Sequence, residues 1–119
     1  MIVDYFSAEA VNSRIKKLKL KNKKFKLISS FAMFYDIDDP NKFCKDIHKL
    51  LEKNGIWILE MSHFPMLLSN LTYDQICHEH VTYYTLNVFK KIAEKNKLKV
   101  IDFSFNIING GSIEIVCAP

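Results

Sequence analysis

The chain has 119 residues, of which 49% are hydrophobic and 25% are charged, with only 3 glycines and 3 prolines. This composition is typical of one small folded domain and excludes a low-complexity or fibrous chain. No apolar run approaches the roughly 20 residues of a membrane-spanning helix, and the first ten residues lack the basic start of a signal peptide.

The cysteines and the charge pattern also bear on the class of protein. Cys44, Cys77 and Cys117 are odd in number and widely spaced, which argues against a disulfide framework or zinc knuckle. A reducing compartment suits free thiols, so we expect a cytoplasmic protein. Of the 17 basic residues, eight fall within 14–26, which contain no acid. Such a stretch could bind nucleic acid, but no nucleic-acid module accompanies it, and we interpret it as a solvated helix face and loop.

The first expected elements are a helix and a strand. Ser7 is a suitable N-cap for a helix over about 8–20, with Glu9 in its first turn. Its apolar stripe is formed by Val11, Ile15 and Leu18. The short apolar run 25–34, FKLISSFAMF, has no helical spacing and predicts a buried strand.

The segment 38–55, DDPNKFCKDIHKLLEKNG, predicts a second helix with marked ends. Asp39 can cap it, and Pro40 suits its first position because that backbone nitrogen needs no hydrogen. We expect Asn54 and Gly55 to end this helix in a left-handed turn.

The rest of the chain predicts a sheet. Residues 56–62, IWILEMS, form a continuous apolar run, which is typical of a strand covered on both faces. The remaining expected elements are an irregular or briefly helical stretch over 64–84, a helix over 86–96 capped by Thr85, and two strands over 98–105 and 112–118. This order predicts an open α/β sheet, parallel at first, whose last two strands form an antiparallel pair at its edge.

Polar side chains gather after the expected strands, where open α/β sheets bind ligands. Three segments occupy such positions: FAMFYDIDDP, EMSHFP and YDQICHEHVTYY. Among their polar side chains are Tyr35, Asp36, Glu60, His63, His78, Glu79 and His80. Together they form the candidate site of this sequence.

The run His78-Glu79-His80 admits several interpretations. A metal site is disfavoured because no second Cys/His pair lies at ligand spacing, so we predict no metal. A nucleophilic Cys77 beside His78 is disfavoured because neighbours on an extended chain point to opposite faces. General acid–base catalysis suits an imidazole beside a carboxylate. The simplest alternative is two histidines that only brace a folded loop.

Four segments in this order and spacing resemble the S-adenosylmethionine-dependent sugar C-methyltransferases, which act on nucleotide-linked keto-sugars. They are DYFSAE, MFYDIDDPNKFCKDIHKLLEKNGIWILEMS, YDQICHEHVTYYTL and NGGSIEIVCA. The pair CHEHVTYY and NGGS is the most specific part, and the resemblance covers nearly the whole chain. It implies a partial Rossmann-like α/β fold in which the four strands correspond to strands 4–7 of a class I methyltransferase, the last one antiparallel.

The resemblance also implies roles for particular residues. His80 corresponds to the general base that takes a proton from the carbon beside the sugar ketone, with Glu79 as its orienting partner and His78 close by. Residues 30–33 (Ser30, Phe31, Ala32 and Met33) lie where relatives contact the methionine part of S-adenosylmethionine. Cys77 stands where some sugar enzymes carry tyrosine, and Glu114 stands where many relatives carry arginine.

The same resemblance implies that residues 1–119 are the C-terminal half of a methyltransferase domain. The glycine-rich cofactor loop and the ribose-binding acid of the N-terminal half have no counterpart in the sequence. We therefore expect this chain alone to be inactive, and another chain could supply the missing half. The expected partner is a small-molecule substrate, not a membrane or nucleic acid. A non-catalytic α/β interaction module is the alternative.

Overall fold

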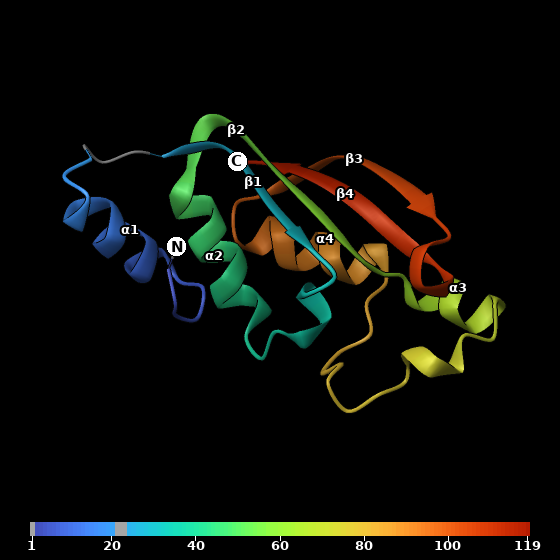
Figure 1. Cartoon of the computed structure of the whole chain (residues 1–119). Coiled ribbons are helices and arrows are strands. Elements are labelled where there is room, and N and C mark those ends of the chain that lie inside the picture. Colours follow the sequence, from blue (N-terminus) through green and yellow to red (C-terminus); the bar gives the residue numbers. More distant parts are fainter. Residues whose placement is uncertain (1, 21–23) are drawn as a thin grey trace.

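Four strands form one sheet in the computed structural model, which describes residues 2–20 and 24–119. The strands are β1 (Phe25–Phe31), β2 (Leu51–Ser62), β3 (Lys99–Asn106) and β4 (Ser112–Ala118), in the spatial order β1-β2-β4-β3 (Figure 1). The strands β1 and β2 are parallel, whereas β4 runs antiparallel to both of its neighbours. This confirms the predicted open sheet and its antiparallel final pair, with β4 inserted between β2 and β3.

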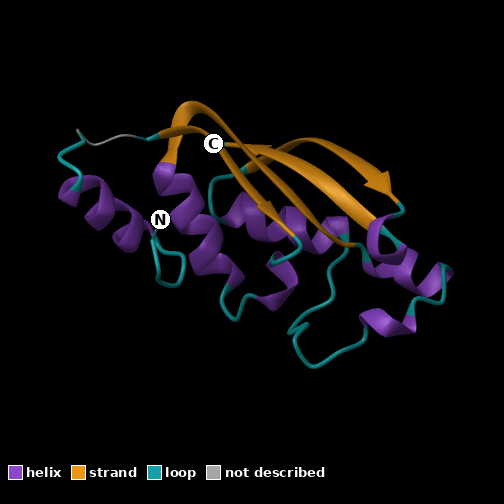
Figure 2. Ribbon diagram, in the orientation of Figure 1, coloured by secondary structure: helices purple, strands orange, loops and turns teal. Residues whose placement is uncertain are grey.

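Three helices lie on one side of this sheet (Figure 2). They are α1 (Ala8–Lys17), α2 (Pro40–Leu50) and α4 (Leu86–Lys95), and α2 packs between the other two. The short elements are α3 (Phe64–Ser69) and the 3-10 turns η1 (Phe34–Asp36), η2 (Tyr73–Gln75) and η3 (Ile108–Gly110). No helix among the described residues is long and apolar enough to cross a membrane.

The core lies between the sheet and these helices. Alternate residues of the two central strands point into it and are fully buried: Trp57, Leu59, Met61, Ile113, Ile115 and Cys117. The Trp57 ring meets Phe34, Phe43 and Phe89, with ring centroids 5.9 to 6.0 Å apart. This aromatic cluster fixes η1, α2 and α4 against β2.

The opposite face of the sheet carries no helix among the described residues. On β1, Phe25, Leu27 and Phe31 keep 36%, 56% and 53% of their surface exposed. The strand predicted over 25–34 forms over Phe25–Phe31, but the prediction that it is buried is wrong. On β2, residues 56–62 are buried or half-buried, as expected. Since β1 is also an edge strand, its outer backbone groups have no neighbouring strand in the described sheet.

The predicted helix starts are confirmed, but two helix ends differ. The Ser7 hydroxyl accepts from the N–H of Ala10 at 3.1 Å, and the Asp39 carboxylate accepts from the N–H of Lys42 at 2.9 Å. Helix α1 ends at Lys17, short of the predicted residue 20, and Leu18 is exposed.

Helix α2 ends at Leu50, so the prediction that Asn54 and Gly55 close it in a left-handed turn is wrong. Gly55 lies within β2 without a positive φ. A Cβ there would stand 2.7 Å from the carbonyl oxygen of Phe25. Glycine is thus needed for close approach of β2 to β1.

Candidate functional site

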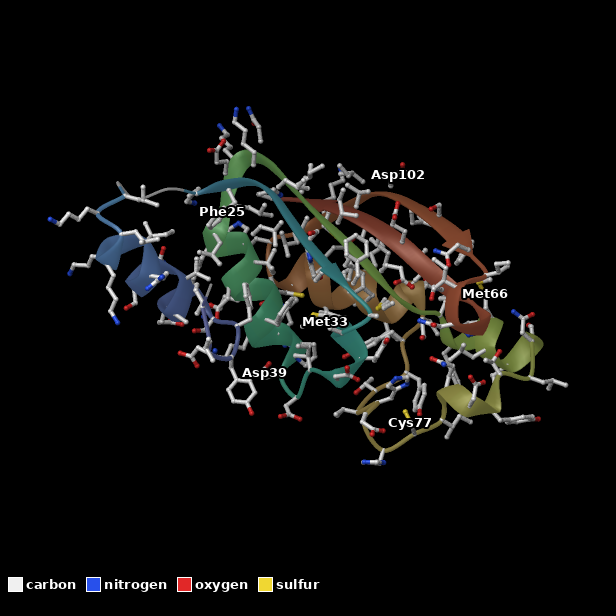
Figure 3. The ribbon with its side chains drawn as sticks, viewed as in Figure 1. Phe25, Met33, Asp39, Met66, Cys77 and Asp102 are labelled. Carbon is white, nitrogen blue, oxygen red and sulfur yellow. The ribbon has the colours of Figure 1, made fainter. Side chains whose placement is uncertain are left out.

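Backbone hydrogen bonds join the segments that follow β1 and β2. The N–H of Ala32 donates to the carbonyl of Glu60 at 3.0 Å, and the N–H of Thr82 donates to the carbonyl of Tyr35 at 3.1 Å. Figure 3 shows Met33 just past the end of β1 and Cys77 in the loop that follows η2. The fold therefore brings all three predicted loop segments into contact at one end of the sheet.

His80 lies against the ring of Tyr35. The two ring centroids are 4.2 Å apart with an interplanar angle of 48°. The backbone N–H of His80 donates to the backbone carbonyl of Cys77 at 3.3 Å. The Nδ1 atom of His80 is buried and has no hydrogen-bond partner among the described residues. One face of the imidazole is thus fixed by an aromatic neighbour, while a buried nitrogen is left unsatisfied.

The carboxylate of Glu79 lies beside His78 and makes no ion pair with His80. Its Oε1 is 3.4 Å from Nε2 of His78, and the side chains of His78 and Glu79 are 92% and 63% exposed. The arrangement expected from the resemblance, with Glu79 orienting His80, is not formed in this structure. An exposed pair of this kind contributes little stability.

A set of polar contacts connects the end of β2 to the ring of Tyr83. The hydroxyl of Ser62 donates to Oε1 of Gln75 at 3.4 Å, and the hydroxyl of Tyr83 donates to the carbonyl of Gln75 at 3.3 Å. The Tyr83 ring lies 6.0 Å from the ring of His80. Residues 73–83 therefore approach the side of β2 to which Ser62 points.

The turn between β3 and β4 is hydrogen-bonded to residues 70–72, which precede this loop in the chain. Asn70 and Thr72 both donate side-chain hydrogen bonds to the carbonyl of Gly110, at 2.7 and 3.2 Å. Gly110 and Gly111 have positive φ, and a Cβ on Gly110 would collide with the Thr72 side chain. The Asn-Gly-Gly run is thus needed both for its turn and for this close packing.

Glu60 is a buried acid at this end of β2 that sequence reasoning placed in the site without a role. It is only 8% exposed, and its Oε1 has no hydrogen-bond partner among the described residues. Strand register sets it between Phe31 of β1 and Glu114 of β4. The sequence does carry a signal for such a role, namely a single acid inside an apolar strand. A buried carboxylate is costly unless it is paired, so an acid at such a position suggests a function.

Burial changes the proton affinity of two nearby groups. The pKa of Tyr35 is raised, first by burial and then by the charges of Asp36, Glu60 and Cys77. The pKa of His63 is lowered by burial. Tyr35 therefore carries a neutral hydroxyl at physiological pH, and His63 a neutral imidazole. The ring centroid of His63 lies 5.0 Å from that of Phe105.

The residues predicted to touch the cofactor have different surroundings. The Ser30 hydroxyl accepts from Nε1 of Trp57 at 2.9 Å, and Met33 packs against the core. Phe31 is exposed, and Ala32 has a positive φ of 51°. Ser30 and Met33 thus make contacts within the fold, and the cofactor-binding role of all four residues stays a prediction.

The described residues contain no group of three or more histidine, cysteine, aspartate or glutamate side chains placed to hold a metal ion. The side chains at this end of the sheet include imidazole, phenol and carboxylate groups. These are the groups of proton transfer and of hydrogen bonding to a substrate.

The strand order, the antiparallel β4 and the polar groups beyond β1 and β2 define a partial Rossmann-like fold of the class I methyltransferase type. Residues 3–102 match the methyltransferase domain family, and the chain belongs to that family.

Similar proteins agree with this assignment. The chain is 30% identical over 94 residues to the C-methyltransferase NovU of Streptomyces niveus, a match that takes in 79% of this chain and 22% of NovU. An S-adenosylmethionine-dependent methyltransferase from Clostridium acetobutylicum matches with a TM-score of 0.64 at 14% identity, over 92% of this chain and 70% of that one.

LepI in complex with SAM matches with a TM-score of 0.61 at 8% identity, over 81% of this chain and 26% of LepI. At such low identity these two structures show the fold alone. The chain spans about a fifth of the length of the curated relative that it matches.

Proposed function

We propose that this chain is part of an S-adenosylmethionine-dependent C-methyltransferase whose general base is His80. Its substrate would be a nucleotide-linked keto-sugar or a related small molecule. The observation that carries the proposal is the placement of His80 at the strand ends, with its ring held 4.2 Å from that of Tyr35. Relatives supply the second support, because NovU is named as a C-methyltransferase.

The reaction requires a base because the carbon beside a ketone is not nucleophilic until a proton is removed from it. In the proposal, His80 accepts this proton, and the electron pair of the C–H bond remains on the substrate as an enolate. S-adenosylmethionine, when bound, supplies a methyl group on a positively charged sulfur. Phe31 and Ala32 would hold its methionine end, and the neutral hydroxyl of Tyr35 is a hydrogen-bond donor within the same site.

We also propose that residues 1–119 form the C-terminal half of the methyltransferase domain, completed by a preceding segment or by another chain. The unpaired edge of β1 and its exposed Phe25, Leu27 and Phe31 support this, since an exposed apolar strand edge normally has a covering partner. A non-catalytic interaction module would use the same apolar surface.

The experiment that tests the function is solvent deuterium exchange with the intact enzyme that contains this chain. A nucleotide-linked keto-sugar is incubated with enzyme in D₂O, with and without S-adenosylmethionine. We expect exchange beside the ketone without the methyl donor, and transfer of the methyl group to that carbon with it. Methyl transfer to oxygen or nitrogen, with no exchange at carbon, would refute a carbon-directed base.

A further inference from the structure

Two buried atoms of opposite hydrogen-bonding character at this end of the sheet have no partner among the described residues. One is Oε1 of Glu60, an acceptor, and the other is Nδ1 of His80, which can donate when protonated. A buried polar atom without a partner costs about 1–3 kcal/mol, and more when it is charged. A hydrogen-bond partner for either atom would therefore stabilise the folded chain.

The chain contacts place the His80 loop on the Glu60 side of β2. Glu60 and Ser62 are two residues apart on a regular strand, so their side chains point to the same face. Ser62 contacts Gln75, Gln75 contacts Tyr83, and the Tyr83 ring lies 6.0 Å from that of His80.

The surroundings of Tyr35 agree with this placement. Its ring is in contact with His80, and the charge of Glu60 is among the causes that raise its pKa.

The other possible partners of these two atoms are less suitable. Nδ1 of His63 is also buried without a partner, but His63 is three residues from Glu60 and its ring contacts Phe105 instead. Glu79 contacts His78. Glu114, directly across from Glu60, carries the same charge and adds repulsion. Of these groups, His80 is the one whose ring contacts Tyr35 and whose buried Nδ1 has no other neighbour to satisfy it among the described residues.

We propose that Glu60, and not Glu79, is the carboxylate that orients His80, by accepting a hydrogen bond from its Nδ1–H directly or through one water molecule. This proposal rests on the proposed role of His80 as base. With the proton held on Nδ1, the lone pair of Nε2 is directed to the substrate, and the carboxylate stabilises the imidazolium that forms. Glu60 is then a positioning residue that acts through His80.

The tautomer of His80 tests the proposal in this chain without substrate or cofactor. Long-range ¹H–¹⁵N NMR at about pH 8, where an ordinary imidazole with its pKa of about 6.5 is neutral, shows which ring nitrogen carries the proton. The His80 signals are assigned by their absence in His80→Gln. We expect the Nδ1–H tautomer in the unmodified chain and a shift toward Nε2–H, by about tenfold in the ratio of tautomers, in Glu60→Leu.

Matched variants separate the three acids. Glu79→Leu and Glu114→Leu should leave the His80 tautomer unchanged, and Glu60→Gln, which keeps an acceptor oxygen, should retain most of the Nδ1–H form. A His80 that is Nε2–H in the unmodified chain overturns the proposal even where Glu60→Leu does not fold. A tautomer that responds to Glu79→Leu and not to Glu60→Leu also overturns it.

This readout is independent of the reaction. Were His80→Gln to leave turnover of the intact enzyme unchanged, the proposed base would be wrong while the Glu60–His80 pair could still stand. Were the tautomer to be insensitive to Glu60, His80 could remain the base with another orienting group.

Discussion

The rings of Tyr35 and His80 lie 4.2 Å apart, although one follows β1 and the other belongs to the long loop after β2. The N–H of Thr82 donates to the carbonyl of Tyr35 beside this contact, so backbone and side chain fix the same junction. The histidine is thus positioned by packing against η1, which is itself held in the aromatic cluster around Phe34. Such support is needed where an imidazole must meet a substrate in one orientation.

The N-cap of α2 should contribute measurably to stability. The substitution Asp39→Ala removes the carboxylate that accepts from the N–H of Lys42, and we expect a loss of about 1 kcal/mol in the free energy of unfolding. Asp38→Ala is the matched control, because it removes a neighbouring acid outside the cap. Urea unfolding of both variants measures the difference, and equal losses would show that the cap is not the cause.

The hydrogen bond between Trp57 and Ser30 joins β2 to β1 across the core face. The variant Ser30→Ala leaves the buried indole N–H without its partner, and we expect a cost of about 1–3 kcal/mol. Ser29→Ala, on the exposed face of the same strand, should cost less than about 0.5 kcal/mol. Denaturant unfolding that finds Ser29→Ala as costly as Ser30→Ala would contradict this assignment.

The order of the elements could be predicted because each has a local signal. Ser7, Asp39 and Thr85 are caps whose side chains accept the expected backbone bonds. The antiparallel last pair followed from two strands with no helix between them. Local chemistry was sufficient there because turns and caps involve neighbouring residues.

The end of α2 could not be predicted from its local signal. Asn54-Gly55 is a usual helix stop, but here Gly55 permits close backbone contact with Phe25, a neighbour that the sequence does not reveal. Likewise, an apolar strand such as β1 predicts burial, whereas exposure depends on which elements are present to cover it.

The candidate site shows the same limit. Placement after the strands predicted that Tyr35, Glu60 and His80 would gather, and the ring contact between Tyr35 and His80 agrees with this for that pair. The sequence could not predict which carboxylate contacts which histidine, because that depends on the direction of each side chain. Adjacent residues suggested Glu79 for His80, yet its carboxylate contacts His78.

Asp46 should make the stability of the chain depend on pH. Burial by itself raises the pKa of this carboxyl, but the Lys49 ammonium, the backbone of Ala8 and the Lys42 ammonium together hold it below its ordinary value. Because the folded-state pKa is lower than the unfolded one, the contribution is fully present above the ordinary pKa of about 3.9 and is lost as pH falls through the folded value.

The measurement for Asp46 is urea unfolding of the unmodified chain and of Asp46→Asn at about pH 7 and at about pH 2.5. We expect Asp46→Asn to be less stable at the higher pH and the difference to shrink at the lower one, where the carboxyl approaches protonation. A difference that stays constant with pH would mean that the ion pairs with Lys42 and Lys49 add nothing.

The isolated chain should bind S-adenosylmethionine too weakly to measure at micromolar concentrations. Contacts with adenine and ribose in nucleotide-binding α/β folds come from the first strand–loop junctions of the sheet, which the resemblance assigns to the N-terminal half. Phe31 and Ala32 offer only one end of a site. Isothermal titration calorimetry of residues 1–119 checks this, and micromolar binding would show that the chain holds a complete cofactor site.

His80, more than His78, should be required for turnover of the intact enzyme. The His80 ring is held by Tyr35 and has a buried Nδ1, whereas the side chain of His78 is 92% exposed and contacts only Glu79 among the described ionisable groups. A base must keep one position relative to the substrate, which an exposed side chain does not. We therefore expect His80→Gln to lower kcat by about 100-fold or more with cofactor binding unchanged, the usual loss for an acid–base group.

His78→Gln is the control for the preceding prediction, since it removes the same type of side chain two residues away. It should change kcat by much less than tenfold, because its imidazole has no fixed neighbour that would aim it at a substrate. Thermal unfolding of both variants separates catalysis from bracing: a histidine that only braces the loop against Tyr35 would lower stability and leave kcat nearly intact. Equal small losses of kcat from both substitutions, or a larger loss from His78→Gln, would show that His80 is not the base.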